Sequence, residues 1–291
     1  MSTCKVIQIE TPKKYILDGL LLGSEKTKTV FIFMHGLGGS LFSQMKLADS
    51  LVSKNNSVIV FNNRGFGTIN RIKKINKKNF KGYENITAGF AHEIFTDCID
   101  DIDGAVNYAL KIGAKEIVLV GHSTGCQKSV YYLSKRKKSK VSGAVLLAPM
   151  SDFADMFAFT ELKKYKKLID TAKSMVKNNK SSELMPSNLW SIPTDAQRFL
   201  SLFSPESTEE IFSYASGKEP IILKSVKKPL LIVLAGNDEY KDRPITEIFS
   251  WFKNVLINKK NEIKIIDKAP HNFIDHVFEL EGIIKKWLVN Y

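Results

Sequence analysis

Short apolar, β-prone runs alternate with amphipathic helical segments along most of this chain. The runs expected to form strands are 6–10, 15–22, 30–34, 58–61, 117–120, 144–148, 230–235 and 263–266, and the first two are expected to pair as a hairpin. Apolar residues at helical spacing predict helices at 41–51, 95–110, 126–134, 245–255 and 273–289. This alternation predicts the α/β class, with a mostly parallel central sheet of about eight strands flanked by helices.

The alternation stops between Pro149 and Pro229. Residues 162–176 carry an amphipathic helical stripe there, and a turn-rich stretch follows at 181–193. A connection of this length is far longer than a crossover needs. We therefore expect a core built from 1–149 and 229–291, and a helical lid, 150–228, inserted after the sixth strand.

The charge of the chain is strongly positive. Its 291 residues are 44% hydrophobic and carry 43 basic against 30 acidic side chains, for a net charge of +13. Only Arg64, Arg71, Arg136, Arg198 and Arg243 are arginine, the residue preferred for bidentate recognition of bases. The lysines lack the interleaved aromatic residues of a single-strand binder, so we expect a solvated basic surface and no nucleic-acid partner.

Targeting and cysteine signals are weak. No apolar run approaches the roughly 20 residues that span a bilayer, and the first residues show no secretory leader. Cys4, Cys98 and Cys126 are widely spaced and form no C-x-x-C pair, which argues against disulfides and thiolate metal sites. We expect a cytoplasmic protein without membrane insertion, acting as a monomer or a homodimer.

Gly121-His122-Ser123-Thr124-Gly125 follows the apolar run 117–120 and precedes a helical segment. This is the G-x-S-x-G pattern at a strand-to-helix turn, where small neighbours let a serine hydroxyl stand exposed. The context predicts that Ser123 is a catalytic nucleophile. The alternative is a glycine-bounded turn whose serine has no chemical role.

A serine hydroxyl needs a base and an orienting carboxylate. His271 follows the last expected strand and Asp238 follows the strand at 230–235, so both stand where a triad in this order would place them. Asp152, after the strand at 144–148, and Asp242 are the alternative acids. His271 as a loop or helix-cap residue and Asp238 as a turn cap are the structural alternatives.

Acyl transfer also requires donors for the negative charge that develops on the carbonyl oxygen. The amide of Thr124, directly after the serine, is one expected donor. The second is expected from the turn His35-Gly36-Leu37-Gly38-Gly39, through the amide of Leu37. This turn has neither G-x-G-x-x-G nor the Lys-Ser/Thr ending of a phosphate loop.

With the serine motif, the His-Gly turn, Asp238 and His271 in this order, the chain resembles the α/β-hydrolase superfamily along nearly its whole length. Residues 63–67, Asn-Arg-Gly-Phe-Gly, match the structural D-x-R-G-x-G turn of that superfamily except at Asn63. The run G-H-S-T-G-C-Q from Gly121 is similar to a fungal and plant branch in which one known activity is hydrolysis of hydroxamate siderophore esters. The lysine-rich segment 71–81, taken as a loop, has no counterpart in that resemblance.

The resemblance implies a serine hydrolase that cleaves a small-molecule carboxylic ester through an acyl-enzyme and needs no cofactor or metal. An acyltransferase or thioesterase would carry the same triad, and a non-catalytic ligand-binding protein is the alternative from another class. Phe153, Phe157 and Trp190 are aromatic residues of the expected lid that would line a substrate pocket. Packing of the lid itself explains the same residues equally well.

Overall fold

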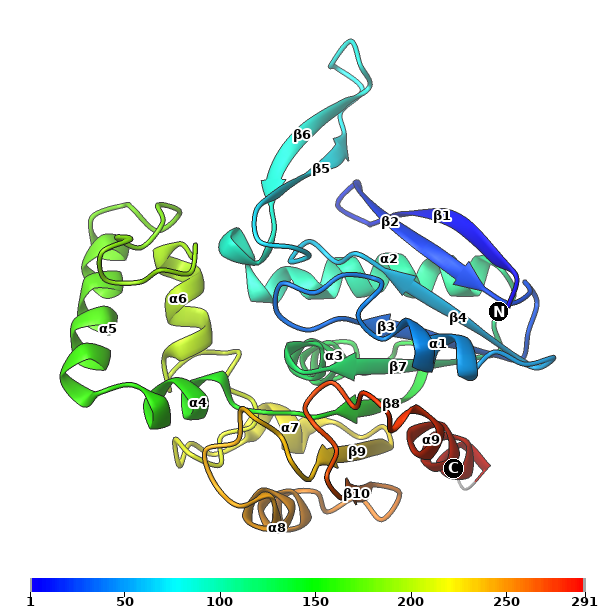
Figure 1. The fold of residues 1–291 in the computed structure, drawn as a ribbon. Helices are drawn as coiled ribbons and strands as arrows, with labels where there is room; N and C mark the ends of the chain where they lie inside the picture. Colours follow the sequence, from blue (N-terminus) through cyan, green and yellow to red (C-terminus); the bar gives the residue numbers. More distant parts are fainter. Residues whose placement is uncertain (1, 290–291) are drawn as a thin grey trace.

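A mixed sheet of ten strands runs through the centre of the computed structural model, which describes residues 2–289 (Figure 1). The strands are β1 (Cys4–Glu10), β2 (Tyr15–Leu22), β3 (Thr29–Met34), β4 (Asn56–Phe61), β5 (Asn70–Ile75), β6 (Tyr83–Ala88), β7 (Glu116–His122), β8 (Val141–Leu147), β9 (Leu230–Ala235) and β10 (Glu262–Ile266). Their order is β10-β9-β8-β7-β3-β4-β2-β5-β6, with β1 paired to β2. The pairs among β3, β4, β7, β8, β9 and β10 are parallel, and the pairs that involve β1, β2, β5 or β6 are antiparallel.

Helices cover both faces of this sheet and account for its apolar strands. The helices are α1 (Met45–Ser50), η1 (Phe90–His92), η2 (Phe95–Asp97), α2 (Cys98–Lys111), α3 (Thr124–Lys135), α4 (Asp152–Phe159), α5 (Leu162–Lys177), α6 (Ala196–Phe203), α7 (Ile221–Ser225), α8 (Ile245–Val255) and α9 (Val277–Val289). One core lies between the sheet and α2, α3 and α8, and the other lies between the sheet and α1 and α9. Strands β3 and β9 are buried at every position, as expected of parallel strands covered on both faces. Across residues 2–289, no helix combines the length and apolar content that a membrane-spanning segment requires.

The predicted α/β architecture is confirmed, but the expectation of about eight strands is too low. The segment 71–81, taken as a loop, instead belongs to the β5–β6 hairpin at the sheet's end, which Figure 1 shows projecting from the body. Only Ile72 of β5 is buried, so the strand carries almost no hydrophobic alternation.

Two predicted helices are shorter than their apolar stripes. The first begins at Met45 and not at residue 41, because the residues before it form turns. The last begins at Val277 and not at 273, because Phe273 and Asp275 have φ angles of 54° and 66°, which end any regular helix there. The backbone before each helix is thereby left free to form a loop at the carboxyl edge of the sheet.

Residues 150–228 leave the sheet after β8, and their helices α4, α5 and α6 form a group beside it, on the left in Figure 1. Strand β8 is the sixth strand once the β5–β6 hairpin is set aside. The helices α4, α5 and α6 enclose a small apolar core of their own, which includes Phe153, Leu168 and Phe199. The rest of 150–228 differs, because Phe212, Tyr214 and Leu223 pack into the core between the sheet and α2, α3 and α8.

A buried carboxylate, Glu93, joins this segment to the core. It lies 2.5 Å from the ammonium of Lys128 on α3 and 3.0 Å from the guanidinium of Arg198 on α6. A neighbouring contact runs from His92 Nδ1 to Asp195 Oδ2, 3.1 Å apart. Charges this deeply buried are tolerated only when paired, so these contacts fix α6 against the core.

The turn at 63–67 accommodates that carboxylate. A Cβ atom on Gly65 would overlap the carboxylate of Glu93, which explains glycine at this position. The adjacent Arg64 is held by Asp101 at 2.6 Å and by Asp100 at 3.0 Å. These contacts agree with the interpretation of this turn as structural.

Replacing Gly65 with alanine is expected to destabilise the protein, because the new methyl group must displace a buried, ion-paired carboxylate. We expect the free energy of unfolding to fall by roughly 1–3 kcal/mol, as for other overpacked sites. Gly282→Ala is the matched control, since nothing lies within 4 Å of its Cβ position in α9. Urea denaturation measures both variants, and equal stability of the two would contradict this account of the turn.

Candidate active site

Ser123 is the single residue between β7 and α3, and few residues adopt its backbone conformation. Its φ and ψ are 52° and −126°. Its amide donates to the carbonyl of Leu147 at 3.0 Å, and its carbonyl accepts from the amide of Cys126 at 2.8 Å. A non-glycine residue held at positive φ is a strained position that its surroundings must enforce.

Glycines on three sides make this turn possible. A Cβ on Gly121 would collide with the main chain of Gly125, and a Cβ on Gly125 would collide with the carbonyl of Met34 at the end of β3. A Cβ on Gly36 would lie 2.8 Å from Ser123 Cβ. The His-Gly turn therefore lies directly against the serine, as expected for a turn that supplies an oxyanion donor.

His271 and Asp238 form a buried pair, with Nδ1 and Oδ2 2.8 Å apart. Asp238 follows β9 and His271 follows β10, two neighbouring parallel strands, so both loops lie at the carboxyl edge of the sheet. The amide of Tyr240 donates to the second oxygen of Asp238 at 3.0 Å. Asp238 is thus oriented by its own loop while it contacts the imidazole.

Three further residues hold the His271 loop, and sequence reasoning missed all of them in this role. The carboxylate of Glu239 accepts from the His271 amide at 2.9 Å, and His122 Nε2 lies 2.9 Å from the His271 carbonyl. The ring of Tyr240 lies edge-on to the imidazole at a centroid distance of 4.9 Å. His122 adjoins Ser123, so its contact ties the His271 loop to the serine turn.

The alternative acids have other partners. Asp152, at the start of α4, accepts from Gln127 Nε2 at 3.0 Å. Burial raises the pKa of its carboxyl well above the ordinary value, and the nearby Glu209 raises it further. Asp242 pairs with the guanidinium of Arg243 at 2.7 Å. The structure places Asp238, and neither of these two, against His271.

The two expected oxyanion donors come from turns that meet at Ser123. Thr124 is the first residue of α3 and is buried, while Leu37 lies next to Gly36 in the His-Gly turn. His35 begins that turn, and its Nδ1 lies 2.9 Å from the carbonyl of Gly36. Burial, with Lys128 nearby, lowers the pKa of His35 to about 4, so this histidine is neutral near pH 7.

The aromatic residues expected to line a substrate pocket pack within the 150–228 segment. Trp190 lies edge-on to Phe199 and to Phe203, at centroid distances of 5.2 and 5.5 Å. Phe153 is buried and stacks on Phe157 at 5.5 Å. These contacts favour the alternative interpretation for Phe153 and Trp190, which is packing of the segment itself.

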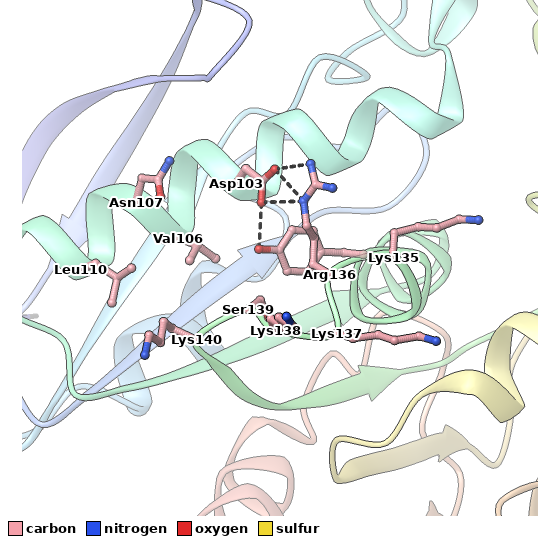
Figure 2. Close-up of a pocket in the computed structure, with 11 residues that line it drawn as sticks. Asp103, Val106, Asn107, Leu110, Lys135, Arg136, Lys137, Lys138, Ser139 and Lys140 are labelled. Carbon is pink, nitrogen blue, oxygen red and sulfur yellow. Dashed lines mark hydrogen bonds and ion pairs between the residues drawn. The ribbon is translucent and has the colours of Figure 1, made fainter.

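A depression of about 500 Å³ lies at the opposite end of the sheet, where α3 ends and the chain turns into β8 (Figure 2). Asp103 lines it and accepts hydrogen bonds from Tyr132 and Arg136, at 3.0 and 2.8 Å. Figure 2 shows the side chains of Lys135 and Lys137 directed away from Asp103. The basic residues here diverge, so they do not form a convergent site for an anion.

All three cysteines, Cys4, Cys98 and Cys126, are free thiols. Among residues 2–289, no three histidine, cysteine, aspartate or glutamate side chains gather in a way that would hold a metal ion.

Solved structures that are similar to this chain show its fold. An alpha/beta hydrolase from Penicillium aligns over 98% of this chain and 96% of its own, with a TM-score of 0.65 and 15% identity. An esterase from Pyrococcus furiosus aligns over 100% of this chain and 92% of its own, with a TM-score of 0.63 and 19% identity. The chain therefore has the α/β-hydrolase fold.

Sequence comparison identifies the family within that class. Residues 88–290 match the family described as "Protein of unknown function (DUF1749)", and the chain belongs to it. A UPF0613 protein of Schizosaccharomyces pombe is 29% identical over 225 residues, which is 66% of this chain and 68% of that protein. A protein of Mycoplasma pneumoniae, provisionally named esterase/lipase 3, is 28% identical over 186 residues, or 62% of this chain and 66% of its own.

Acid is expected to destabilise the protein through His35 and His122. Burial lowers the pKa of each from 6.5 to about 4, so both stay neutral in the folded state where the unfolded chain binds protons. Their contribution to the free energy of unfolding is fully present above pH 6.5 and is lost as the pH falls toward 4. It amounts to on the order of 2–3 kcal/mol for each histidine.

His122→Gln tests this, because glutamine keeps a donor for the His271 carbonyl and does not titrate. We expect the loss of unfolding free energy between pH 7.5 and pH 5 to be smaller in the variant than in the wild type, as measured by urea denaturation. The effect of Glu210, whose pKa burial raises to about 7, is common to both proteins and cancels in this difference. An unchanged pH dependence would show that His122 does not contribute in this way.

Proposed function

We propose that this protein hydrolyses carboxylic esters, with Ser123 as nucleophile, His271 as general base and Asp238 as the carboxylate that orients the histidine. The observation that carries the proposal is the buried His271–Asp238 pair, 2.8 Å apart, in a loop tied through His122 to the strained Ser123 turn. The α/β-hydrolase fold and the name of the Mycoplasma relative support the same chemistry. The fold alone would not identify this chemistry, since one fold hosts many functions.

In the proposed reaction, Ser123 Oγ attacks the ester carbonyl while its proton passes to Nε2 of His271. Asp238 accepts a hydrogen bond from Nδ1–H and so leaves Nε2 free to act as the base. The amides of Leu37 and Thr124 donate to the oxyanion. The C–O bond then breaks, the alcohol departs with the proton from His271, and water releases the acid from the acyl-enzyme by the same steps.

We further propose that residues 150–228 act as a cap, with 1–149 and 229–291 as the catalytic core. The cap departs from the sheet after β8, which neighbours the β7 strand that leads into Ser123. The contacts of Arg198 with Glu93 hold α6 against the core.

Ser123→Ala is expected to lower kcat for an aryl ester by on the order of 10⁶, the usual cost of losing a catalytic serine. Ser129→Ala is the matched control, since this hydroxyl of α3 bonds to the carbonyl of Gly125 in the interior. Its activity should stay near that of the wild type. Hydrolysis rates are measured with a panel of aryl esters and a hydroxamate siderophore ester, which also gives the substrate preference. A competing alcohol added to the same assays shows whether the acyl group is transferred to an acceptor other than water. Retained activity in Ser123→Ala would overturn the proposal.

Asp238→Asn and Asp152→Asn distinguish the two candidate acids. We expect Asp238→Asn to lower kcat by about 10⁴, because an amide favours the wrong histidine tautomer. Asp152→Asn should change kcat little, because Asp152 contacts Gln127 and not His271, and an asparagine oxygen accepts the same hydrogen bond. Steady-state kinetics of both variants decide the matter, and a greater loss in Asp152→Asn would identify Asp152 as the acid.

A further inference from the structure

The corner between α4 and α5 exposes large apolar side chains. Phe157 is 48% exposed, Phe159 67% and Leu162 50%, all within six residues of chain. Single exposed apolar residues are common on any protein surface, but a group at one corner marks an interaction site. Figure 1 shows this corner at the outer side of the 150–228 segment, away from the sheet.

The local structure holds these side chains outward. Helix α4 ends at Phe159, the chain is extended at Thr160, and α5 begins at Leu162. Phe157 rests on Phe153 and on Tyr165, each at a centroid distance of 5.5 Å. One side of its ring is thereby anchored while nearly half of the residue stays in contact with solvent.

The surface next to this corner is basic. Helix α5 turns its apolar side, with Tyr165, Leu168 and Ala172, into the core of the segment. Its outward side carries exposed lysines at positions 163, 164, 166, 167, 173 and 177, and Asp170 is its one acidic residue. Among residues 2–289, no carboxylate lies within ion-pair distance of the first four lysines, so their charges are not neutralised within the chain.

We propose that this corner and the α5 lysines form a docking surface for a lipid bilayer that contains anionic lipids. Lysine ammonium groups beside a membrane are attracted by the negative surface, and aromatic and leucine side chains enter the boundary between headgroups and acyl chains. An acidic protein would meet the charge but would leave the three apolar side chains of the corner without a matching environment. This inference does not depend on whether Ser123 reacts with esters.

Flotation of the full-length protein with lipid vesicles tests the proposal. We expect binding to vesicles of phosphatidylcholine with 30% phosphatidylserine, because anionic lipids give the vesicle surface a negative potential. Binding should weaken as salt rises, and vesicles of phosphatidylcholine alone should bind at least tenfold less. Equal binding to both kinds of vesicle, or binding to neither, would overturn the proposal.

Two variants separate the charge and apolar parts of the surface. Replacing Lys163, Lys164, Lys166 and Lys167 with glutamine should weaken binding at least tenfold, since each lysine near an anionic surface contributes about fivefold. Phe159→Ser combined with Leu162→Ser should also weaken it at least tenfold. All six side chains are exposed, and circular dichroism checks that both variants are folded.

Matched controls exclude a general effect of the net charge. Replacing Lys135, Lys137, Lys138 and Lys140, the cluster of Figure 2, with glutamine removes the same charge from the other end of the sheet. Phe80→Ser combined with Phe278→Ser removes two exposed aromatic residues far from α5 in the chain. Both controls should bind as the wild type does. A control that loses as much binding as its α5 counterpart would show that the corner is not the docking surface.

Discussion

The fold depends on a close approach of three main-chain segments around Ser123. The end of β3, the turn at Gly36 and the first turn of α3 lie very close together. A Cβ atom at Gly36, Gly121 or Gly125 would therefore overlap neighbouring atoms. This approach requires β3 and β7 to be neighbours in the sheet, and they pair in parallel from Thr29 to Met34. The positive φ of Ser123 is a local cost that the packed sheet and helices on either side compensate.

The second constraint is the buried charge of Glu93. It pairs with Lys128 on the helix that follows Ser123 and with Arg198 on the segment outside the sheet. Removing one partner of such a group leaves an uncompensated charge, at a cost of about 3–5 kcal/mol. The same carboxylate therefore stabilises both the helix after the serine turn and the attachment of α6. The helices α4 and α5 lack this anchor, and their outer surface carries the apolar corner and the lysines.

The parts of the fold that the sequence predicted are those with strong local signals. Strands β3, β7 and β9 are continuous apolar runs because helices bury both of their faces. Residues of the hairpin β5–β6 lie at an exposed edge, where lysines replace the hydrophobic alternation, so their pairing could not be predicted. Positive φ at Phe273 makes the last helix begin later than its apolar stripe indicated.

The site residues that have strong local sequence signals were also predictable. Ser123, Asp238 and His271 each follow a strand in a recognisable order, and the structure brings Asp238 and His271 into contact. The sequence favoured Asp238 but left Asp152 as an alternative, because both follow strands of the same sheet, and the structure shows only Asp238 in contact with His271. Glu239 and His122 were missed in their contacts with the His271 loop, since nothing in their own sequence positions indicates which distant backbone groups they meet.

The central claim is that Ser123 is activated by His271, and covalent labelling tests it most directly. A fluorophosphonate probe should add one group to the native protein, and peptide mapping by mass spectrometry should place it on Ser123. The His271→Gln variant should label far more slowly, because the serine has then lost its base. A native protein that stays unlabelled, or that carries the label on another serine, would contradict the account.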